Sequence, residues 1–303
     1  MNQIQVTKRN GTREPLDLDK FHKVVQWACE GIKNVSESEI ELRSHIQFNN
    51  GIKTTDIQET LIKAAADLIS EDNPGYQYVA GRLINYHLRK EVYGDYTVPD
   101  LQTHIESVVS LGYYDPNILD WYSVSDLAIL NAYIDHNRDF NIAYAGMEQL
   151  RGKYLLRNRV TKKIFETPQF VYMLVAMVLF RNYKEDRLKW VKDLYDATST
   201  FIISLPTPIM AGLRSPQKQF SSCVLIETDD SLDSINATSS AIVKYVSQKA
   251  GIGIGAGNIR AIGSAIRNGD TTHTGVIPFY KLFQSAVKSC CVTPDSWVEV
   301  LDE

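Results

Sequence analysis

The spacing of hydrophobic and polar residues predicts a small mixed module at the start of the chain. A short alternating stretch leads to Asn10-Gly11, a dipeptide typical of a hairpin turn. Apolar residues at helical spacing then predict helices at about 20–32, from near Thr55, and from Tyr76 to about Tyr93. Residues 1–92 are therefore expected to form a β-hairpin followed by helices.

The middle of the chain, from about 98 to 200, is predicted to be mainly helical. Its longest wholly apolar run, Phe170 to Phe180, has eleven residues. A membrane-spanning helix needs about 20, so we interpret this run as a buried core helix. Earlier in the chain, Thr55 and Gln58 have the three-residue spacing of a capping box and should begin the helix there.

The last third has the pattern of an α/β protein. Short β-rich segments are expected at Phe201–Leu205 and Ser222–Glu227. A long helix follows, from about Ser231 to Ala250, with Asp230 or Ser231 as its cap and Gly251 closing its end. Strands separated by helices indicate a mixed α/β fold here.

Composition and charge narrow the function classes. The chain has 303 residues, 32 Lys and Arg against 36 Asp and Glu, and a formal net charge of −4. This balance argues against a nucleic-acid protein with a basic surface. The N-terminus has no apolar signal region, so we expect a cytoplasmic protein without a membrane segment.

Neither a metal site nor a common nucleotide motif is predicted. The four cysteines (Cys29, Cys223, Cys290 and Cys291) form no CxxC, and the six histidines are scattered, so we expect no metal bound by this chain. The glycines between 251 and 257 do not fit G-x-G-x-x-G, and no P-loop motif occurs. A tight backbone passage between a helix and a strand is the simpler interpretation of this run.

Several residues allow both a functional and an ordinary interpretation. Asp230 and Ser231 at a helix start, with Arg260 and Arg267, can form a phosphate site, or be a routine cap and solvated arginines. Cys223 lies in an apolar run, where a small core residue is the simpler assignment.

The same choice applies to the remaining basic and thiol groups. Three lysines of the first module (Lys8, Lys20 and Lys90) can reach a triphosphate or be merely solvated. The adjacent Cys290 and Cys291 are most simply two free thiols, because neighbouring residues rarely reach the Cα separation that a disulfide needs.

Five stretches of the sequence carry a resemblance to a known family. From residue 1 to about 290 the chain closely resembles the N-terminal part of the large (alpha) subunit of class I aerobic ribonucleoside-diphosphate reductase. The stretches are 76–83, 203–210, 219–226, 230–236 and 273–279.

The resemblance implies a mixed α/β architecture in three parts. Residues 1–92 would be an ATP cone, where ATP activates and dATP inhibits. Residues 93–200 would be a helical domain, and residues 201–290 the first, incomplete part of a ten-stranded α/β barrel.

The resemblance also assigns roles to individual residues. Cys223 would be one cysteine of the redox pair that reduces the ribose, and Thr207 and Ser222 would contact substrate. The remaining assignments are effector contacts: Lys8, Glu14 and the segment to Lys20, Thr54 and Lys90 in the ATP cone, and Asp230, Ser231, Leu232, Arg260 and Arg267 in a site for deoxynucleoside triphosphates that selects the substrate base.

The implied partners follow from what the family needs and this chain lacks. The second redox cysteine and the thiyl-radical cysteine fall in the absent part, so a second large-subunit fragment is expected. A radical-generating small subunit, a large-subunit homodimer, and thioredoxin or glutaredoxin as reductant are expected as well, and Mg²⁺ with the nucleotides. The alternative is a nucleotide-binding regulatory protein without catalytic activity.

The last thirteen residues depart from the family and resemble the first block of an intein. Cys291 would be the nucleophile of an N-to-S acyl shift, because a thiol at that position can attack the preceding carbonyl. Later intein blocks are absent. The tail is thus expected to act with a partner chain or to be a remnant, and an unrelated frame-shifted tail is the alternative.

Overall fold

The computed structural model describes residues 4–45, 49–217, 219–248 and 250–290. The chain forms two compact units, residues 1–217 and 218–303, and each is described by itself. Cys291 and the rest of the predicted intein-like tail lie outside the described residues.

The first unit begins with an N-terminal module, residues 4–93, as the hairpin and helix patterns predict. Its sheet has the order β2-β1-β3, in which β1 pairs antiparallel with β2 and parallel with β3. The turn contains Gly11, whose φ of 83° favours glycine. The elements are β1 (Gln5–Thr7), β2 (Arg13–Pro15), α1 (Leu18–Cys29), α2 (Glu37–Ser44), β3 (Ile52–Lys53), α3 (Thr54–Asp67) and α4 (Tyr76–Tyr93).

The capping box predicted at Thr55 and Gln58 is wrong. Helix α3 begins one residue earlier, with Lys53 at the N-cap position and no side-chain hydrogen bond to the first turn. Gln58 is buried and its amide lies 3.5 Å from the carbonyl of Leu83 on α4. Packing of α3 against α4 thus places Gln58 in the core and away from the helix end.

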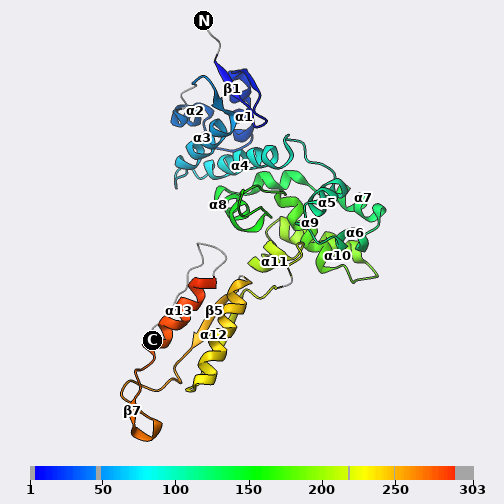
Figure 1. Cartoon of the computed structure of the whole chain (residues 1–303). Coiled ribbons are helices and arrows are strands. Elements are labelled where there is room, and N and C mark those ends of the chain that lie inside the picture. The colour runs from blue at the N-terminus through cyan, green and yellow to red at the C-terminus, as the bar shows by residue number, and fades with distance from the viewer. Residues whose placement is uncertain (1–3, 46–48, 218, 249, 291–303) are drawn as a thin grey trace. The chain divides into compact units, whose positions relative to one another are not determined.

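The rest of the first unit is helical, as predicted, and α9 is the buried core helix expected at Phe170–Phe180 (Figure 1). No helix of the described residues is long and apolar enough to cross a membrane. The elements are α5 (Leu101–Ser110), α6 (Asn117–Trp121), α7 (Val124–Tyr133), the 3₁₀ helix η1 (His136–Asn141), α8 (Tyr144–Gln149), the π-helix η2 (Leu150–Tyr154), α9 (Pro168–Leu179), α10 (Arg187–Ser199) and α11 (Thr207–Gly212).

The β-rich segment predicted at Phe201–Leu205 is not a strand. Phe201 has a φ of 62°, and the amide of Ile203 bonds back to the carbonyl of Ala197 in α10 at 3.0 Å. These residues therefore close the end of α10 instead of extending.

A buried charged pair holds the helical part together. Arg214 and Glu166 are both fully buried and form an ion pair, and Arg214 Nε donates to Glu166 at 2.7 Å. The hydroxyl of Tyr114 donates to Glu166 at 2.6 Å and contacts Nε2 of His104 at 2.9 Å. Burial opposes the charge of Arg214, but Glu166 outweighs this and raises its pKa.

The second unit is built on a β–α–β element. Strands β4 (Cys223–Glu227) and β5 (Gly251–Gly255) are parallel and are joined by α12 (Leu232–Ser247), as the α/β pattern predicts. The remaining elements are β6 (Ala265–Ile266), the 3₁₀ turn η3 (Arg267–Gly269), β7 (Thr271–Thr272) and α13 (Ile277–Cys290).

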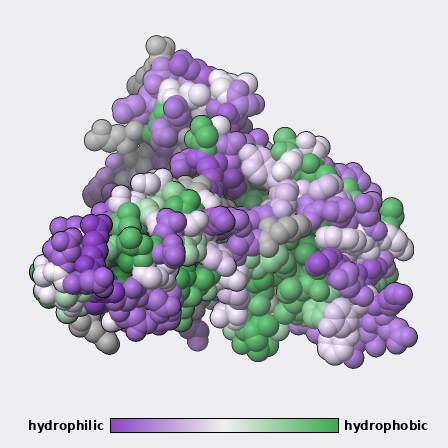
Figure 2. Space-filling model, turned by 60° about the horizontal axis from the view of Figure 1, so that its bottom comes forward, coloured by the Kyte–Doolittle hydropathy of each residue, from purple (hydrophilic) through white to green (hydrophobic). Residues whose placement is uncertain are grey.

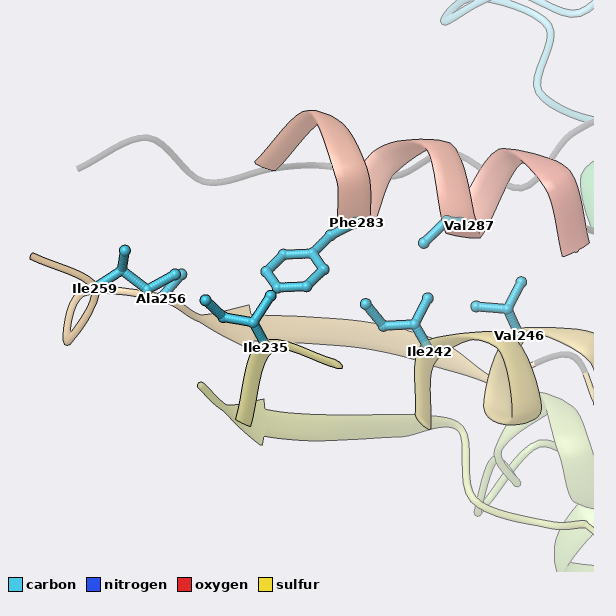
Figure 3. Close-up of a cluster of buried hydrophobic side chains, with 7 residues drawn as sticks. All are labelled: Ile235, Ile242, Val246, Ala256, Ile259, Phe283 and Val287. Carbon is cyan, nitrogen blue, oxygen red and sulfur yellow. The ribbon is translucent and has the colours of Figure 1, made fainter. Parts of the chain in front are cut away.

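One face of this small sheet carries the core of the second unit. Phe283 and Val287 of α13 point toward Ile235, Ile242 and Val246 of α12 (Figure 3). Ile226, Ile252 and Ile254, on alternate positions of the two strands, pack against the same cluster. The alternation of a strand thus places every second residue of β4 on this covered face.

Gly251 does not close α12, contrary to the prediction. The helix ends at Ser247 with Gln248 as its cap, and the amide of Gly251 bonds to the carbonyl of Ser222 at 2.9 Å as β5 begins. Residues 251–255 of the glycine run form a strand and not a loop passage, because their backbone pairs with β4; Ala256 and Gly257 follow the strand.

Candidate functional site

One cavity in the N-terminal module collects all five residues predicted as ATP-cone contacts. Its volume is about 810 Å³, which is ample for a nucleotide. We call it the lysine-lined cavity; the predicted residues that line it are Lys8, Glu14, Lys20, Thr54 and Lys90.

Elements far apart in the sequence bring these side chains together. The hairpin supplies Lys8 and Glu14, the first turn of α1 supplies Lys20, and the last turn of α4 supplies Lys90. Thr54 is the first residue of α3. The cavity therefore depends on the fold of the whole module.

The carboxylate of Glu14 forms ion pairs with two of the lysines that line the cavity. Its carboxylate lies 3.0 Å from Lys8 Nζ and 3.9 Å from Lys20 Nζ, and Lys20 also lies 3.6 Å from Asp17. These are exposed pairs of small energetic value. An incoming polyanion can therefore replace the carboxylates as partner of the two lysines.

An aromatic wall faces the cations and was missed by the sequence analysis. Phe21, Trp27 and Tyr86 line the cavity. Lys90 Nζ donates to the hydroxyl of Tyr86 at 2.6 Å and lies 4.4 Å from its ring centroid. The cavity thus combines a flat apolar surface for a base with cations for phosphates.

The missed lining has a sequence signal at helical spacing. Lys20, Val24 and Trp27 recur at the three- and four-residue steps of one helix face, and Tyr86 precedes Lys90 by four residues. Basic and aromatic residues mixed on one face are therefore the pattern that indicates this cavity.

Cys223 lies on the uncovered face of the β4–β5 sheet. It is exposed, so the small-core-residue interpretation is wrong. Leu225, two residues on, is 86% exposed. Cys223 pairs with Gly251, and Leu225 pairs with Gly253. Because these glycines of β5 have no side chain, the side chains of Cys223 and Leu225 have space beside them.

Ser222 and Thr207 occupy different units. Cys223 Sγ lies 3.9 Å from Ser222 Oγ. Thr207 is the exposed first residue of α11 in the first unit. The structure therefore joins Ser222 to Cys223, and the assignment of Thr207 to the same pocket stays a prediction.

Four of the five residues predicted for the second effector site lie around the start of α12. Arg260 Nε lies 2.6 Å from Asp230 Oδ2, and the backbone amide of Arg260 donates to Asp230 Oδ1 at 3.2 Å. These bonds, the backbone one first, lower the pKa of Asp230. Ser231 caps α12 by accepting from the amide of Ser234, and Leu232 is 78% exposed.

Arg267 is the exception. It lies in η3 with an exposed side chain, and within the described residues no hydrogen bond or ion pair joins that side chain to Asp230 or Arg260. The other four residues lie together around the helix start, and the effector role of all five stays a prediction.

No group of three or more His, Cys, Asp or Glu side chains in the described part of the chain is arranged to hold a metal ion.

The sequence matches three domain models in consecutive order. These are the ATP cone domain over residues 4–91, the all-alpha domain of ribonucleotide reductase over 140–218, and its barrel domain over 221–292. They agree with the mixed α/β architecture expected from the sequence.

Curated relatives match nearly the whole chain. It is 61% identical over 292 residues to ribonucleoside-diphosphate reductase 1 subunit alpha of Escherichia coli, covering 96% of this chain and 38% of the relative. The alpha subunit of Haemophilus influenzae is 62% identical over 288 residues, covering 95% and 38%, and that of Enterobacteria phage T4 is 49% identical over 292 residues, covering 96% and 38%. The chain thus spans 38% of the length of these relatives and corresponds to their N-terminal ATP cone, all-alpha domain and start of the barrel domain.

Proposed function

We propose that this chain, which corresponds to the N-terminal region of a class I ribonucleoside-diphosphate reductase alpha subunit, is one piece of a split large subunit. It supplies effector sites and one redox cysteine to the reduction of ribonucleoside diphosphates for DNA synthesis. The observation that carries the proposal is the lysine-lined cavity, where all five family-matched residues meet.

The lysine-lined cavity binds ATP or dATP, with Mg²⁺ on the phosphates. Lys8, Lys20 and Lys90 compensate the phosphate charge, which is the role that ammonium groups take at polyphosphates. The base packs on the apolar side, near Trp27 and Tyr86. Occupancy by ATP or dATP is then the signal that regulates the enzyme.

Cys223 supplies half of the reducing power at the ribose. The 2′-hydroxyl leaves as water while two thiols lose two electrons and close to a disulfide, which an external dithiol such as thioredoxin or glutaredoxin resets. Cys29 is no substitute for the second thiol, because it is buried in the N-terminal module and burial raises its pKa to about 11. As the resemblance implies, the second thiol and the radical cysteine come from a second large-subunit fragment, and the radical from a small subunit.

The start of α12 holds the second effector, a deoxynucleoside triphosphate. The amides of the first helical turn and Arg260 provide donors for phosphate oxygens, and a helix N-terminus favours anions. The Asp230–Arg260 pair fixes the arginine beside this end. In the homodimer the site selects which ribonucleotide base is accepted.

The tail after Cys290 decides how the two fragments are joined. We propose that it derives from an intein, with Cys291 as the splicing nucleophile when a partner chain carries the remaining blocks. Intact mass from the native source tests the splicing step: loss of residues 291–303 and a covalent joint to the second fragment support splicing. A mass of all 303 residues contradicts splicing and leaves a non-covalent two-piece enzyme or an inactive fragment.

Reconstitution tests the catalytic role. The purified chain is mixed with the second fragment, the small subunit and a dithiol reductant, and deoxyribonucleotide formation is measured. We expect no turnover from the 303-residue chain without the second fragment, turnover from the full mixture, and loss of turnover with Cys223→Ser. Cys290→Ser, at the end of α13, is the matched control and should retain activity.

Two outcomes contradict the catalytic proposal. Full activity of Cys223→Ser would remove the cysteine from the chemistry. Nucleotide binding without any turnover of the complete mixture would support the alternative, a regulatory nucleotide-binding protein.

A further inference from the structure

A second cavity lies in the first unit and shares Arg9 and Glu91 with the lysine-lined cavity. Its volume is about 600 Å³. We call it the arginine-lined cavity, because Arg9, Arg151 and Arg157 line it together with Lys162. None of the residues predicted from the sequence as effector contacts lines this cavity.

Two of the basic residues that line this cavity, Arg157 and Lys162, belong to a small hairpin in the helical part of the first unit. Arg157 pairs with Ile164 in an antiparallel bridge, and the amide of Asn158 bonds to the carbonyl of Lys163 at 2.9 Å. Lys162 lies at the turn with a φ of 62°. The hairpin backbone therefore fixes where Arg157 and Lys162 emerge.

The charge balance of the cavity leaves these two cations available. Glu148 is engaged by Arg151 at 2.8 Å. Arg9 Nη2 lies 3.1 Å from His87 Nδ1, and Glu59 and Glu91 also line the cavity, so its four cations stand against three carboxylates. Within the described residues Arg157 and Lys162 have exposed side chains with no ion pair.

The N-terminus of α3 adds a further positive element. Thr54 lines the lysine-lined cavity and Thr55, the next residue, lines the arginine-lined cavity. The N-cap residue Lys53 gives the first turn no side-chain hydrogen bond. An uncapped helix start carries partial positive charge and free amide donors, which favour anions.

The lining also indicates which part of a ligand is recognised. Among its described lining residues Ile164 is the only large hydrophobic one and none is Phe, Trp or Tyr, whereas Phe21, Trp27 and Tyr86 line the lysine-lined cavity. Guanidinium groups bind phosphate oxygens in pairs without reading a base.

We propose that the arginine-lined cavity is a second anion site, which takes the phosphate groups of a polyphosphate or nucleotide without selecting the base. It adjoins the proposed effector site, with which it shares Arg9 and Glu91, and it does not depend on the proposed reductase activity.

Calorimetric titration of inorganic tripolyphosphate into the full chain tests the site. The titrations use a Lys8→Ala/Lys20→Ala/Arg260→Ala background, which removes cations from the lysine-lined cavity and from the proposed effector site at the start of α12. We expect one saturable site, weakened at least tenfold by adding Arg157→Ala and Lys162→Ala. The matched control adds Arg159→Ala and Lys163→Ala, which remove the same charge from the same hairpin outside the lining, and should change the affinity less than twofold. ATP and CTP should bind the background chain equally.

Three results would overturn the site: no binding to the background chain at millimolar tripolyphosphate, equal weakening by the two alanine pairs, or a strong preference between ATP and CTP. Titration of ATP into the unaltered chain separates this proposal from the previous one. Equal ATP binding by the unaltered and the background chain, with tripolyphosphate binding intact, would refute the proposed effector sites alone. ATP binding by the unaltered chain, with no tripolyphosphate binding by the background chain, would refute the anion site alone.

Discussion

Gly81 is a point of close backbone approach between helix α4 and Ile142 in the helical part of the first unit. A Cβ built on Gly81 lies 2.1 Å from the carbonyl oxygen of Ile142, whereas real Cβ atoms essentially never approach closer than 3.0 Å. Substitution by alanine therefore forces the two backbones apart by about 0.9 Å, the difference between these distances. Because the obstacle is backbone, a side-chain rotation cannot relieve it.

Two opposing contributions decide whether Gly81→Ala raises or lowers the free energy of unfolding. Alanine is favoured over glycine inside a helix by about 1 kcal/mol, and overpacking a rigid contact costs about 1–3 kcal/mol or more. Gly81 is fully buried, and α4 packs on both α8 and η1, so separation also loses their contacts. We expect Gly81→Ala to lower the free energy of unfolding of the first unit by about 2–3 kcal/mol.

Urea unfolding followed by circular dichroism at 222 nm measures this change. Gly152→Ala is the control, because Gly152 lies inside η2 and a Cβ there meets nothing within 4 Å; it should not destabilise the chain and should stabilise it by at most about 1 kcal/mol. A Gly81→Ala chain as stable as the unaltered chain would refute the close approach of α4 to Ile142.

Three further predictions concern buried polar groups and a helix cap. Burial, and then the charge of Arg214, lowers the pKa of His104 from 6.5 to about 3. As pH falls, the unfolded state therefore takes up the proton before the folded state does. The stability that neutral His104 contributes is complete above pH 6.5 and is lost as pH falls toward 3, by about 2 kcal/mol between pH 7 and pH 5. His104→Gln should flatten that pH dependence in urea titrations, and an unchanged slope would contradict it. Glu166→Gln leaves the charge of Arg214 buried without its partner and should cost about 3–5 kcal/mol, measurable by the same titration; a loss under about 1 kcal/mol would count against the pair. Ser231→Ala removes the cap of α12 and should cost about 1 kcal/mol in the second unit, while Ser247→Ala at the other helix end serves as control; equal effects would argue against the cap.

The sequence predicts elements well where one apolar face repeats along a helix. Helix α4 was predicted with its observed bounds, because its core positions recur at helical spacing after the breaker Pro74-Gly75. Helix α2 was missed. It has the sequence ESEIELRS, and only Ile40 and Ser44 are buried, so it lacks a repeating apolar stripe.

The glycine strand shows a different limit. Strand β5 has glycine at every second position, so one of its faces has no side chains and no alternation of apolar and polar residues to detect. It is a strand because β4 pairs with it, and pairing depends on residues nearly thirty positions away. Residue type alone does not predict burial either. Hydrophobic residues also gather in patches on the surface of the molecule (Figure 2), so the exposure of Leu225 could not be predicted from its being a leucine.

The candidate site was predictable where it rests on motifs and not where it rests on packing. The five cone contacts came from the family resemblance, and the fold brings them into one cavity. The aromatic wall of Trp27 and Tyr86, and the arginine-lined cavity, depend on which helix faces meet. Such contacts join residues from different elements, and local spacing does not reveal them.

Calorimetric titration of ATP into the full chain, with Mg²⁺ present, tests the central claim most directly. The account predicts saturable binding at the lysine-lined cavity that Lys8→Ala/Lys20→Ala weakens at least tenfold, a change of about 1.4 kcal/mol or more, while Arg159→Ala/Lys163→Ala leaves it unchanged. Absence of ATP binding, or binding that is the same in the Lys8→Ala/Lys20→Ala chain, would contradict it.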